Sequence, residues 1–375
     1  MMVPLAGGST DHGQAGHSRA RVGGGPGTAS MDAARSAASP LVLSIYPDTT
    51  PVPIPSRRWQ RLLPLLGLAV LALACWALWR ELEGFQWSDL TDYWRKLSWG
   101  KVALACLAIA TSFLLLTGHD WLALRVLGLD QRLRMRLIGL ISFSSYVVSM
   151  NAGGTFVTGG AVRLRSYTAL GLTPGDVGRV VFLCMFFGAC GQMFYAGVLF
   201  AAWSMPWPEE LADDLPLALG TTRPLGLLLL LLATVISLGA ILRRRPLRWG
   251  KINVVTPQAP HALLGISFAA AEWLLACVAL ALLLPTVPEL AIGQVLTIVL
   301  LAKMAALISH VPGGLGVFEV VVLTMMPEGV SNAEILGALL IFRLIYYVIP
   351  LALAATLLLG KEYWLLKVKR RNGGR

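Results

Sequence analysis

Ser149-Met150-Asn151-Ala152-Gly153-Gly154 interrupts one long apolar run of this chain, and Ser309-His310-Val311-Pro312-Gly313-Gly314 interrupts another. Paired glycines, with a proline beside the second pair, stop a regular helix. In hydrocarbon, non-helical backbone persists only where it is buried in protein or lines a cavity, because unpaired N–H and C=O groups are costly there. The two matched breaks therefore predict an internal repeat with a binding site near the middle of the membrane.

Composition places the chain in a membrane. Of its 375 residues, 56% are hydrophobic and 14% are charged, and the mean hydropathy is +0.68. The formal net charge of +11 would suit nucleic acid, but the basic residues gather at the ends of apolar runs, so no nucleic-acid partner is expected. The five cysteines lie inside apolar segments without metal-ligand spacing, so we expect no disulfide framework, no metal and no cofactor.

The lengths of the apolar runs predict an all-α polytopic membrane protein. Six runs are long enough to cross a bilayer as helices, at 62–79, 102–124, 180–203, 224–242, 262–284 and 335–359. The two interrupted runs, 137–162 and 291–326, are predicted to form broken or re-entrant helical hairpins. Residues 1–55 have the composition of a disordered tail, residues 56–366 form the predicted transmembrane domain, and residues 367–375 form a basic tail.

Basic residues mark the cytoplasmic flanks of these runs. Lys and Arg cluster just before residue 62, between 125 and 136, between 243 and 251, and after 366, so the positive-inside rule puts both termini in the cytoplasm. Counted from these anchors, the hairpin at 137–162 enters from the cytoplasmic face and the hairpin at 291–326 from the outer face. Three full crossings separate them, which predicts an inverted repeat in a multi-pass protein of the inner cell membrane.

Four ionisable residues, Glu272, Lys303, Glu319 and Arg343, lie well inside the apolar runs. A charge at that depth costs roughly 2.5 to 3.5 kcal/mol on insertion scales unless it is paired or hydrated. The two acidic and two basic side chains sum to zero, so they can pair around a polar cavity. Two interpretations stay open at this point: a structural ion-pair network that locks helices together, or a path for a substrate or a proton.

Residues beside the first break also suit an anion. Bidentate guanidinium contacts from Arg163 and Arg165 would hold an anionic headgroup, although anchoring at the cytoplasmic face explains both residues equally well. The glycines of the breaks would let half-helix N–H groups face such an anion. Close packing between helices is the alternative use of these small residues.

Two ordered motifs resemble the transmembrane region of the lysylphosphatidylglycerol synthase family, also called the flippase-like family. The first motif runs from Asn151 through Gly153-Gly154 and Gly159-Gly160 to Arg163, Arg165 and Tyr167. The second is Pro312-Gly313-Gly314-Leu315-Gly316-Val317-Phe318-Glu319, followed by Arg343 and Tyr346-Tyr347. The resemblance covers roughly residues 62–366. It does not extend to the C-terminal aminoacyl-transferase domain of the bifunctional family members, which we expect this chain to lack.

The resemblance implies a membrane protein, not an enzyme, that moves a lipid or a lipid-linked headgroup between leaflets. The headgroup would lie between the hairpin tips, where the arginines would bind phosphate and the glutamates would meet a cationic headgroup or exchange a proton. The expected substrate-binding residues are Asn151, Gly153, Gly154, Arg163, Arg165, Tyr167, Glu272, Lys303, Pro312, Gly313, Gly314, Glu319 and Arg343.

Other functions remain open from the sequence. A secondary transporter of a small solute fits an inverted repeat equally well, and an accessory subunit of a separate lipid-modifying enzyme fits the missing domain. An enzyme embedded in the membrane is disfavoured, because the chain has no HExxH motif and no GxxxxGKS or GxxxxGKT loop. The expected partners are a membrane phospholipid or another lipid, with a second copy of the chain and a separate lipid-modifying enzyme left open.

Overall fold

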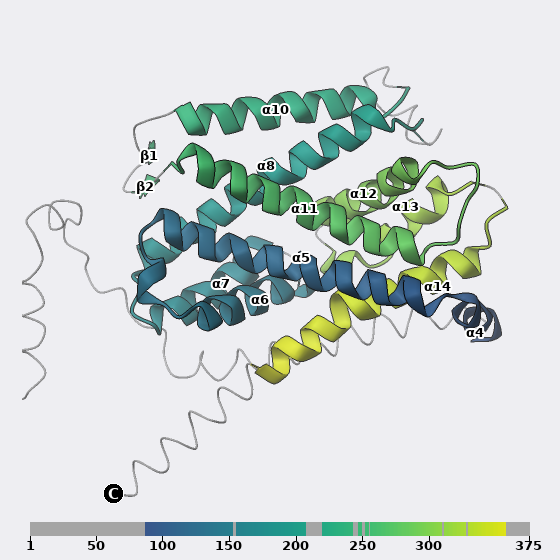
Figure 1. The fold of residues 1–375 in the computed structure, drawn as a ribbon, viewed down its shortest axis with the longest axis horizontal. Helices are drawn as coiled ribbons and strands as arrows, with labels where there is room; N and C mark the ends of the chain where they lie inside the picture. Colours follow the sequence, from purple (N-terminus) through teal and green to yellow (C-terminus); the bar gives the residue numbers. More distant parts are fainter. Residues whose placement is uncertain are drawn as a thin grey trace, which may run out of the picture. The chain divides into compact units, whose positions relative to one another are not determined.

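Helices dominate the computed structural model of the protein (Figure 1). The chain divides into two compact units, Met1–Ile54 and Pro55–Arg375. The structure describes residues 87–152, 155–207, 220–242, 247–249, 252–254, 256–309, 311–327 and 329–357, all of them in the second unit. The predicted tail at 1–55, the predicted first crossing at 62–79 and the predicted basic segment at 367–375 therefore lie outside the described residues.

The described elements form a succession of helices with one small β-ribbon. They are α4 (Trp87–Lys96), α5 (Trp99–Val126), η1 (Asp130–Arg132), α6 (Met135–Ala152), α7 (Thr155–Thr168), α8 (Pro174–Ala202), α10 (Arg223–Leu242), β1 (Leu247–Trp249), β2 (Ile252–Val254), α11 (Ala259–Leu283), α12 (Ile292–Ser309), η2 (Pro312–Gly314), α13 (Val317–Met325), α14 (Asn332–Arg343) and η3 (Leu344–Val348). The π-helical turn η3 continues α14, so that this helix reaches Leu357.

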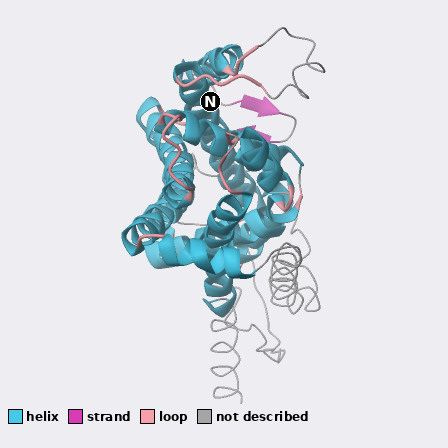
Figure 2. Ribbon diagram, turned by 90° about the vertical axis from the view of Figure 1, so that its right-hand side faces the viewer, coloured by secondary structure: helices cyan, strands magenta, loops and turns pink. Residues whose placement is uncertain are grey.

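The all-α prediction is confirmed, with one small addition. Among the described residues the only strands are β1 and β2, which pair antiparallel with Leu247 opposite Val254 (Figure 2). They lie in the segment between α10 and α11 that the sequence marks as a basic loop. The ribbon is too short to change the fold class.

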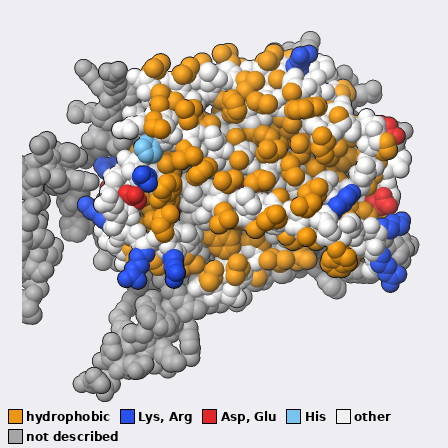
Figure 3. Space-filling model, viewed as in Figure 1, with side chains coloured by type: hydrophobic (Ala, Val, Ile, Leu, Met, Phe, Trp, Pro, Cys, Tyr) orange, Lys and Arg blue, Asp and Glu red, His pale blue; other side chains and the backbone are white. Residues whose placement is uncertain are grey.

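Six of the described helices are long and apolar enough to cross a membrane: α5, α8, α10, α11, α12, and α14 with its extension. Five of them match predicted crossings from 102–124 onward, and α12 is the first arm of the second predicted hairpin. On α10, Leu227, Leu228 and Leu231 are exposed, as a lipid-facing surface requires. Figure 3 shows hydrophobic side chains over most of one face, with charged side chains mainly near its margins. The chain is a multi-pass membrane protein.

The long helices pack closely around α11 and α8. α11 runs along both α5 and α8, and α10 runs along α8 (Figure 1). A Cβ on Gly197 of α8 would lie 2.9 Å from the Gly226 carbonyl of α10, and the reverse holds for Gly226. Such small residues let helix backbones approach each other in a membrane. The Thr173 hydroxyl accepts a hydrogen bond from the Asp176 N–H at 3.1 Å, which fixes the start of α8.

The short helix α4 packs against α14. The Tyr93 hydroxyl donates a hydrogen bond to the Leu283 carbonyl at the end of α11. Burial, with a smaller contribution from Glu334, raises the pKa of Tyr93 to about 12. The hydroxyl therefore stays protonated and keeps this bond at neutral pH.

The second interrupted run forms the predicted broken hairpin. α12 ends at Ser309, η2 follows, and Gly313 and Gly314 have φ angles of 62° and 64°, which glycine adopts without strain. A Cβ on Gly314 would lie 2.5 Å from the Ala306 Cβ, so the two arms are close there. η2 also packs against α6, the first arm of the other hairpin.

The first interrupted run forms the helix pair α6 and α7, which pack against each other. α6 ends at Ala152 and α7 begins at Thr155, so the predicted break at Gly153 and Gly154 falls in the gap outside the described residues. Three long helices, α8, α10 and α11, lie between the two hairpins in the described sequence. The inverted relation of the hairpins remains a prediction.

Candidate functional site

Three clusters of buried charged side chains lie among the described helices, and each joins different elements. We call them the first-hairpin cluster (Asp120, Arg163, Tyr167 and Cys184), the second-hairpin cluster (Gly313, Gly316, Glu319 and Arg343) and the lysine cluster (Glu272, Trp273, Lys303 and Tyr346). Apolar helix faces surround all three. Charges in such surroundings must be paired and hydrogen-bonded, so the contacts within each cluster define its chemistry.

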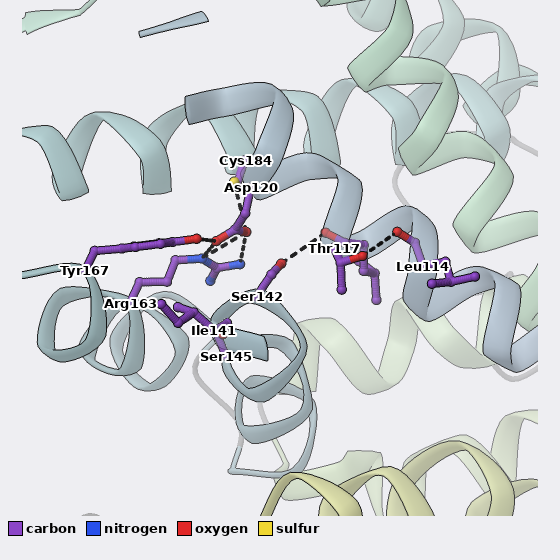
Figure 4. Close-up of polar contacts among 10 residues, drawn as sticks. Leu114, Thr117, Asp120, Ile141, Ser142, Ser145, Arg163, Tyr167 and Cys184 are labelled. Atoms are coloured by element: carbon purple, nitrogen blue, oxygen red, sulfur yellow. Dashed lines mark hydrogen bonds and ion pairs between the residues drawn. The ribbon is translucent and has the colours of Figure 1, made fainter. Parts of the chain in front are cut away.

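The first-hairpin cluster centres on Asp120, whose side chain is 0% exposed and lies in the C-terminal part of α5. Arg163 of α7 donates from Nε to Asp120 Oδ2 at 2.9 Å and from Nη2 to Oδ1 at 2.8 Å. The Tyr167 hydroxyl, one turn further along α7, donates to Oδ2 at 2.9 Å (Figure 4). The Cys184 thiol of α8 lies 3.5 Å from Oδ1. The carboxylate is thus shared by three helices and fully compensated.

Side chains around this pair hold the guanidinium in place. The Arg163 guanidinium carbon lies 4.4 Å from the centre of the Tyr146 ring of α6, a cation–π distance. A Cβ on Gly159 of α7 would lie 2.0 Å from the Ser149 Oγ of α6, so only glycine fits between the two arms there. Neighbouring His119 donates from Nε2 to the Gly265 carbonyl of α11 at 3.2 Å. The cluster therefore ties the first hairpin to α5.

The second-hairpin cluster links the break in the second hairpin to α14. Arg343 donates from Nε to Glu319 Oε1 at 2.7 Å, and its Nη2 is also bonded to that oxygen. Its Nη1 donates to the Gly313 carbonyl at 3.1 Å, inside the break. The other Glu319 oxygen accepts the Gly316 N–H at 2.9 Å, at the start of α13. One ion pair therefore satisfies both a free carbonyl and a free N–H of the broken backbone.

The lysine cluster has looser contacts. Lys303 of α12 is 9% exposed, and its Nζ lies 3.8 Å from Glu272 Oε1 of α11. The same nitrogen lies 3.5 Å from the Tyr346 hydroxyl, which is 3.3 Å from Glu272 Oε1. The Trp273 ring centre is 4.2 Å from Nζ. Lysine and glutamate thus form a buried pair without a short hydrogen bond between them.

Aromatic rings connect the lysine cluster to the second-hairpin cluster. Phe342 stacks on Tyr346 at 5.1 Å between ring centres and on Phe318 at 6.1 Å, with interplanar angles of 12° and 8°. Phe318 precedes Glu319, and Phe342 precedes Arg343. Phe113 of α5 lies 5.8 Å from Tyr346. A continuous set of packed aromatic rings therefore joins the two clusters.

The structure brings most of the predicted site residues into these clusters. Glu319 pairs with Arg343, Glu272 with Lys303, and Arg163 joins Tyr167. Buried Asn151 donates to the Val147 carbonyl of its own helix at 2.9 Å, and Arg165 is half-buried on α7. Pro312 begins η2, while Gly153 and Gly154 lie outside the described residues. Their proposed role in binding a substrate stays a prediction.

Asp120 is a buried site residue that the sequence pattern did not predict. The predicted crossing at 102–124 is apolar overall, yet it contains Gly118-His119-Asp120. An acidic residue inside a crossing is itself a signal for a buried partner, and Arg163 was expected to bind an anion from outside the protein. In the structure, that anion is Asp120. The described residues contain no grouping of three or more His, Cys, Asp or Glu side chains that would hold a metal ion.

The chain is similar in sequence to known membrane proteins. Residues 65–354 match the family described as the lysylphosphatidylglycerol synthase TM region. An uncharacterized protein of Synechocystis, slr0712, is 31% identical over 84% of this chain and 96% of its own length. The inner membrane protein YbhN of Escherichia coli is 29% identical over 76% of this chain and 86% of its own. A phosphatidylglycerol lysyltransferase of Staphylococcus haemolyticus is 38% identical over 23% of this chain, which is 10% of that protein.

Proposed function

Because the chain belongs to the lysylphosphatidylglycerol synthase TM region family, we propose that it moves a lipid or a lipid-linked headgroup between the leaflets of the inner membrane. The headgroup enters between the hairpin tips while its acyl chains stay in the bilayer. The family itself supports a protein connected with lipid modification, and the similarity to an inner membrane protein supports the location. We infer from the positive-inside rule that both termini face the cytoplasm.

One observation carries the proposal: the Glu319–Arg343 pair lies at a break in a helix that packs against the other hairpin. Arg343 holds the Gly313 carbonyl and Glu319 holds the Gly316 N–H, so the pair satisfies backbone groups that an intact helix would satisfy internally. In a bilayer such backbone is tolerated only within protein or beside a cavity. Discontinuous helices of this kind form the substrate sites of many transporters, which favours a translocation path at this place.

The proposal does not include the transfer reaction named in the lysyltransferase relative. The similarity to that protein covers 10% of its length. We propose that this chain moves its ligand without modifying it, and that any modification is made by a separate enzyme. A membrane lipid is then the principal partner, and a second copy of the chain is the other candidate partner.

The test is lipid movement in vesicles that contain the purified protein. Phosphatidylglycerol with a fluorescent nitrobenzoxadiazole group is incorporated in both leaflets, and dithionite then bleaches only the outer leaflet. We expect wild-type vesicles, with or without an imposed pH gradient, to lose fluorescence beyond the outer-leaflet share. Glu319→Gln should abolish this extra loss, because the neutral amide no longer balances Arg343.

The matched control is Glu334→Gln, which removes a partly exposed carboxylate lying 3.9 Å from the largely exposed Lys96. This variant should move lipid as the wild type does. Wild-type vesicles that bleach like protein-free vesicles, for phosphatidylglycerol and for labelled phosphatidylethanolamine and phosphatidylcholine alike, would overturn the proposal. Uptake of a soluble solute by the same vesicles would then favour a solute transporter.

A further inference from the structure

Lys303 differs from the two buried arginines in how its hydrogen-bond donors are used. Arg163 and Arg343 each make at least two N–H···O contacts of 2.7–3.2 Å with carboxylate or carbonyl oxygens. Lys303 has three donors, and its ammonium nitrogen lies 3.5 Å from the nearest hydroxyl and 3.8 Å from the nearest carboxylate oxygen. Good bonds of this type span 2.7–3.2 Å. The ammonium group is therefore buried with most of its donor capacity unused.

Aromatic rings stabilise the Lys303 ammonium group without accepting hydrogen bonds in their planes from its N–H donors. The Trp273 and Tyr346 rings lie 4.2 and 5.3 Å from the ammonium nitrogen, where their faces attract positive charge. Glu272 Oε1 lies 3.8 Å from the nitrogen, which is longer than a good hydrogen bond. A buried cation with aromatic walls and free donors is a suitable site for an oxyanion.

We propose that Lys303 binds the phosphate group of the ligand and that Glu272 takes up one proton as the phosphate binds. This inference rests on the proposed function and adds to it a class of substrate, a phosphate-bearing anionic headgroup, and a coupled ion. The same chemistry would serve a soluble phosphate compound, so the experiment below separates the two sources. The phosphate oxygens accept hydrogen bonds from the ammonium group, replacing its long contacts to Glu272 and Tyr346.

The proton follows from charge balance in a site of low polarity. An ionised Glu272 and a protonated Lys303 sum to zero charge. A bound monoanion beside an ionised Glu272 would leave one uncompensated negative charge, which a buried site disfavours strongly. If a Glu272 oxygen takes a proton from water, the site again contains one cation and one anion. The ammonium group keeps its three protons, and the only covalent bond formed is the O–H bond of the carboxyl group.

The other titratable groups near Glu272 do not supply the cation that balances its carboxylate. Tyr346 and Tyr347 come from η3, and Cys277 lies on α11 itself. Tyr195 of α8 approaches Cys277, and His119 of α5 contacts the Gly265 carbonyl, two turns from Glu272. α10 contributes Arg223 at its first position as its one ionisable residue. Among the described residues, Lys303 is the cation that lies within ion-pair distance of Glu272.

The experiment is calorimetric titration of the purified protein in detergent with dihexanoyl phosphatidylglycerol. Titrations in two buffers of different ionisation enthalpy give the number of protons taken up per lipid bound. For the wild type we expect about one proton taken up per lipid bound. Binding should then weaken by up to about tenfold in Kd for each unit that the pH rises. Glu272→Gln should bind with no proton uptake and a Kd independent of pH, because the amide is already neutral.

Lys303 is tested in the same titration. Lys303→Met should weaken binding by at least about tenfold, since one lost charge-assisted contact exceeds 1.4 kcal/mol. Lys303→Arg keeps the charge and should restore binding, which protects the test if the methionine variant folds poorly. The surface pair gives matched controls: Lys96→Met and Glu334→Gln should bind and take up protons as the wild type does.

Three outcomes would overturn the inference: no proton uptake by the wild type, wild-type uptake in Glu272→Gln, or unchanged binding in Lys303→Met. Titrations with glycerophosphoglycerol and with dihexanoyl phosphatidylcholine distinguish a lipid headgroup from a soluble phosphate compound as the ligand. Binding of the soluble compound as tightly as the lipid would support the phosphate site but contradict lipid translocation. If vesicles move lipid while the titrations fail, the proposed function survives without this site. If the titrations succeed while vesicles move no lipid, the site survives without the proposed function.

Discussion

Asp120→Asn tests whether the first-hairpin cluster is sealed from water. The substitution keeps the shape of the side chain but removes the charge that balances Arg163. Asp120 is 0% exposed and Arg163 is 5% exposed, so neither side chain can find water as a substitute partner in this structure. Removing one partner of a buried pair costs about 3–5 kcal/mol, because the remaining charge stays buried and unpaired. The Tyr167 bond also changes from a charged to a neutral acceptor, which places the expected loss near the upper end of this range.

The measurement is the free energy of unfolding in mixed micelles with increasing dodecyl sulfate, followed by tryptophan fluorescence. Two comparisons isolate the buried charge. Glu334→Gln removes an exposed ion pair and should cost less than about 1 kcal/mol. The double variant Asp120→Asn, Arg163→Met removes both charges and should recover most of the loss, since a neutral replacement of a buried pair is often harmless.

A loss for Asp120→Asn no larger than that for Glu334→Gln would refute this reasoning. Water would then reach Arg163 in the resting protein, and the cluster would line an open path. An additive double variant, with no recovery, would show instead that Asp120 stabilises the bundle through contacts other than its pairing with Arg163.

Three further predictions use the same unfolding measurement. Gly159→Ala should cost about 1–3 kcal/mol, because its Cβ would lie 2.0 Å from a serine oxygen of α6, whereas Gly160→Ala, with nothing within 4 Å, should be neutral or stabilising. Gly314→Ala should cost about 2–4 kcal/mol, because φ is 64° and the Cβ would collide with Ala306. Gly313→Ala adds only the backbone strain and should cost about 1–2 kcal/mol. The pKa of Tyr93 is raised in the folded state from 10.0 to about 12. The contribution of its hydroxyl to the free energy of unfolding is therefore complete below pH 10 and is lost as the pH rises towards 12. Tyr93→Phe should remove this loss of stability at alkaline pH.

Much of the fold could be predicted because membrane helices depend on simple local signals. Runs of 18 or more largely apolar residues predicted α10, α11 and the α14 helix to within three residues at each end, whereas α8 begins six residues before its predicted start. The break at Pro312-Gly313-Gly314 was predictable because two successive residues adopt a positive φ that glycine tolerates. The β1–β2 ribbon was not predictable, because three-residue strands give no periodic pattern.

The candidate site could be predicted only in part, because pairing depends on tertiary packing. The charges of Glu272, Lys303, Glu319 and Arg343 sum to zero, which indicated mutual pairing. The sum did not say which glutamate pairs with which cation. The partners Asp120 and Arg163 are 43 residues apart on helices with no local relationship. A search for every ionisable residue inside the runs would have found Asp120. It would not have revealed that Arg163 is occupied by a carboxylate of the protein itself.

The positions of the two arginine pairs set the cost of moving either hairpin. Arg163 binds the first hairpin to α5, the crossing that precedes it, and Glu319 binds the second hairpin to α14, the crossing that follows it. Separating one pair without giving each side chain a new partner costs about 3–5 kcal/mol. A conformation with one hairpin moved away and no water at the separated charges would therefore be populated at about one part in a thousand. A plain anion that replaced Asp120 at Arg163 would leave the Asp120 carboxylate without its partner. A headgroup that carries both a hydrogen-bond acceptor and a hydrogen-bond donor can satisfy an arginine and a carboxylate together, and such a ligand lowers the cost of opening most.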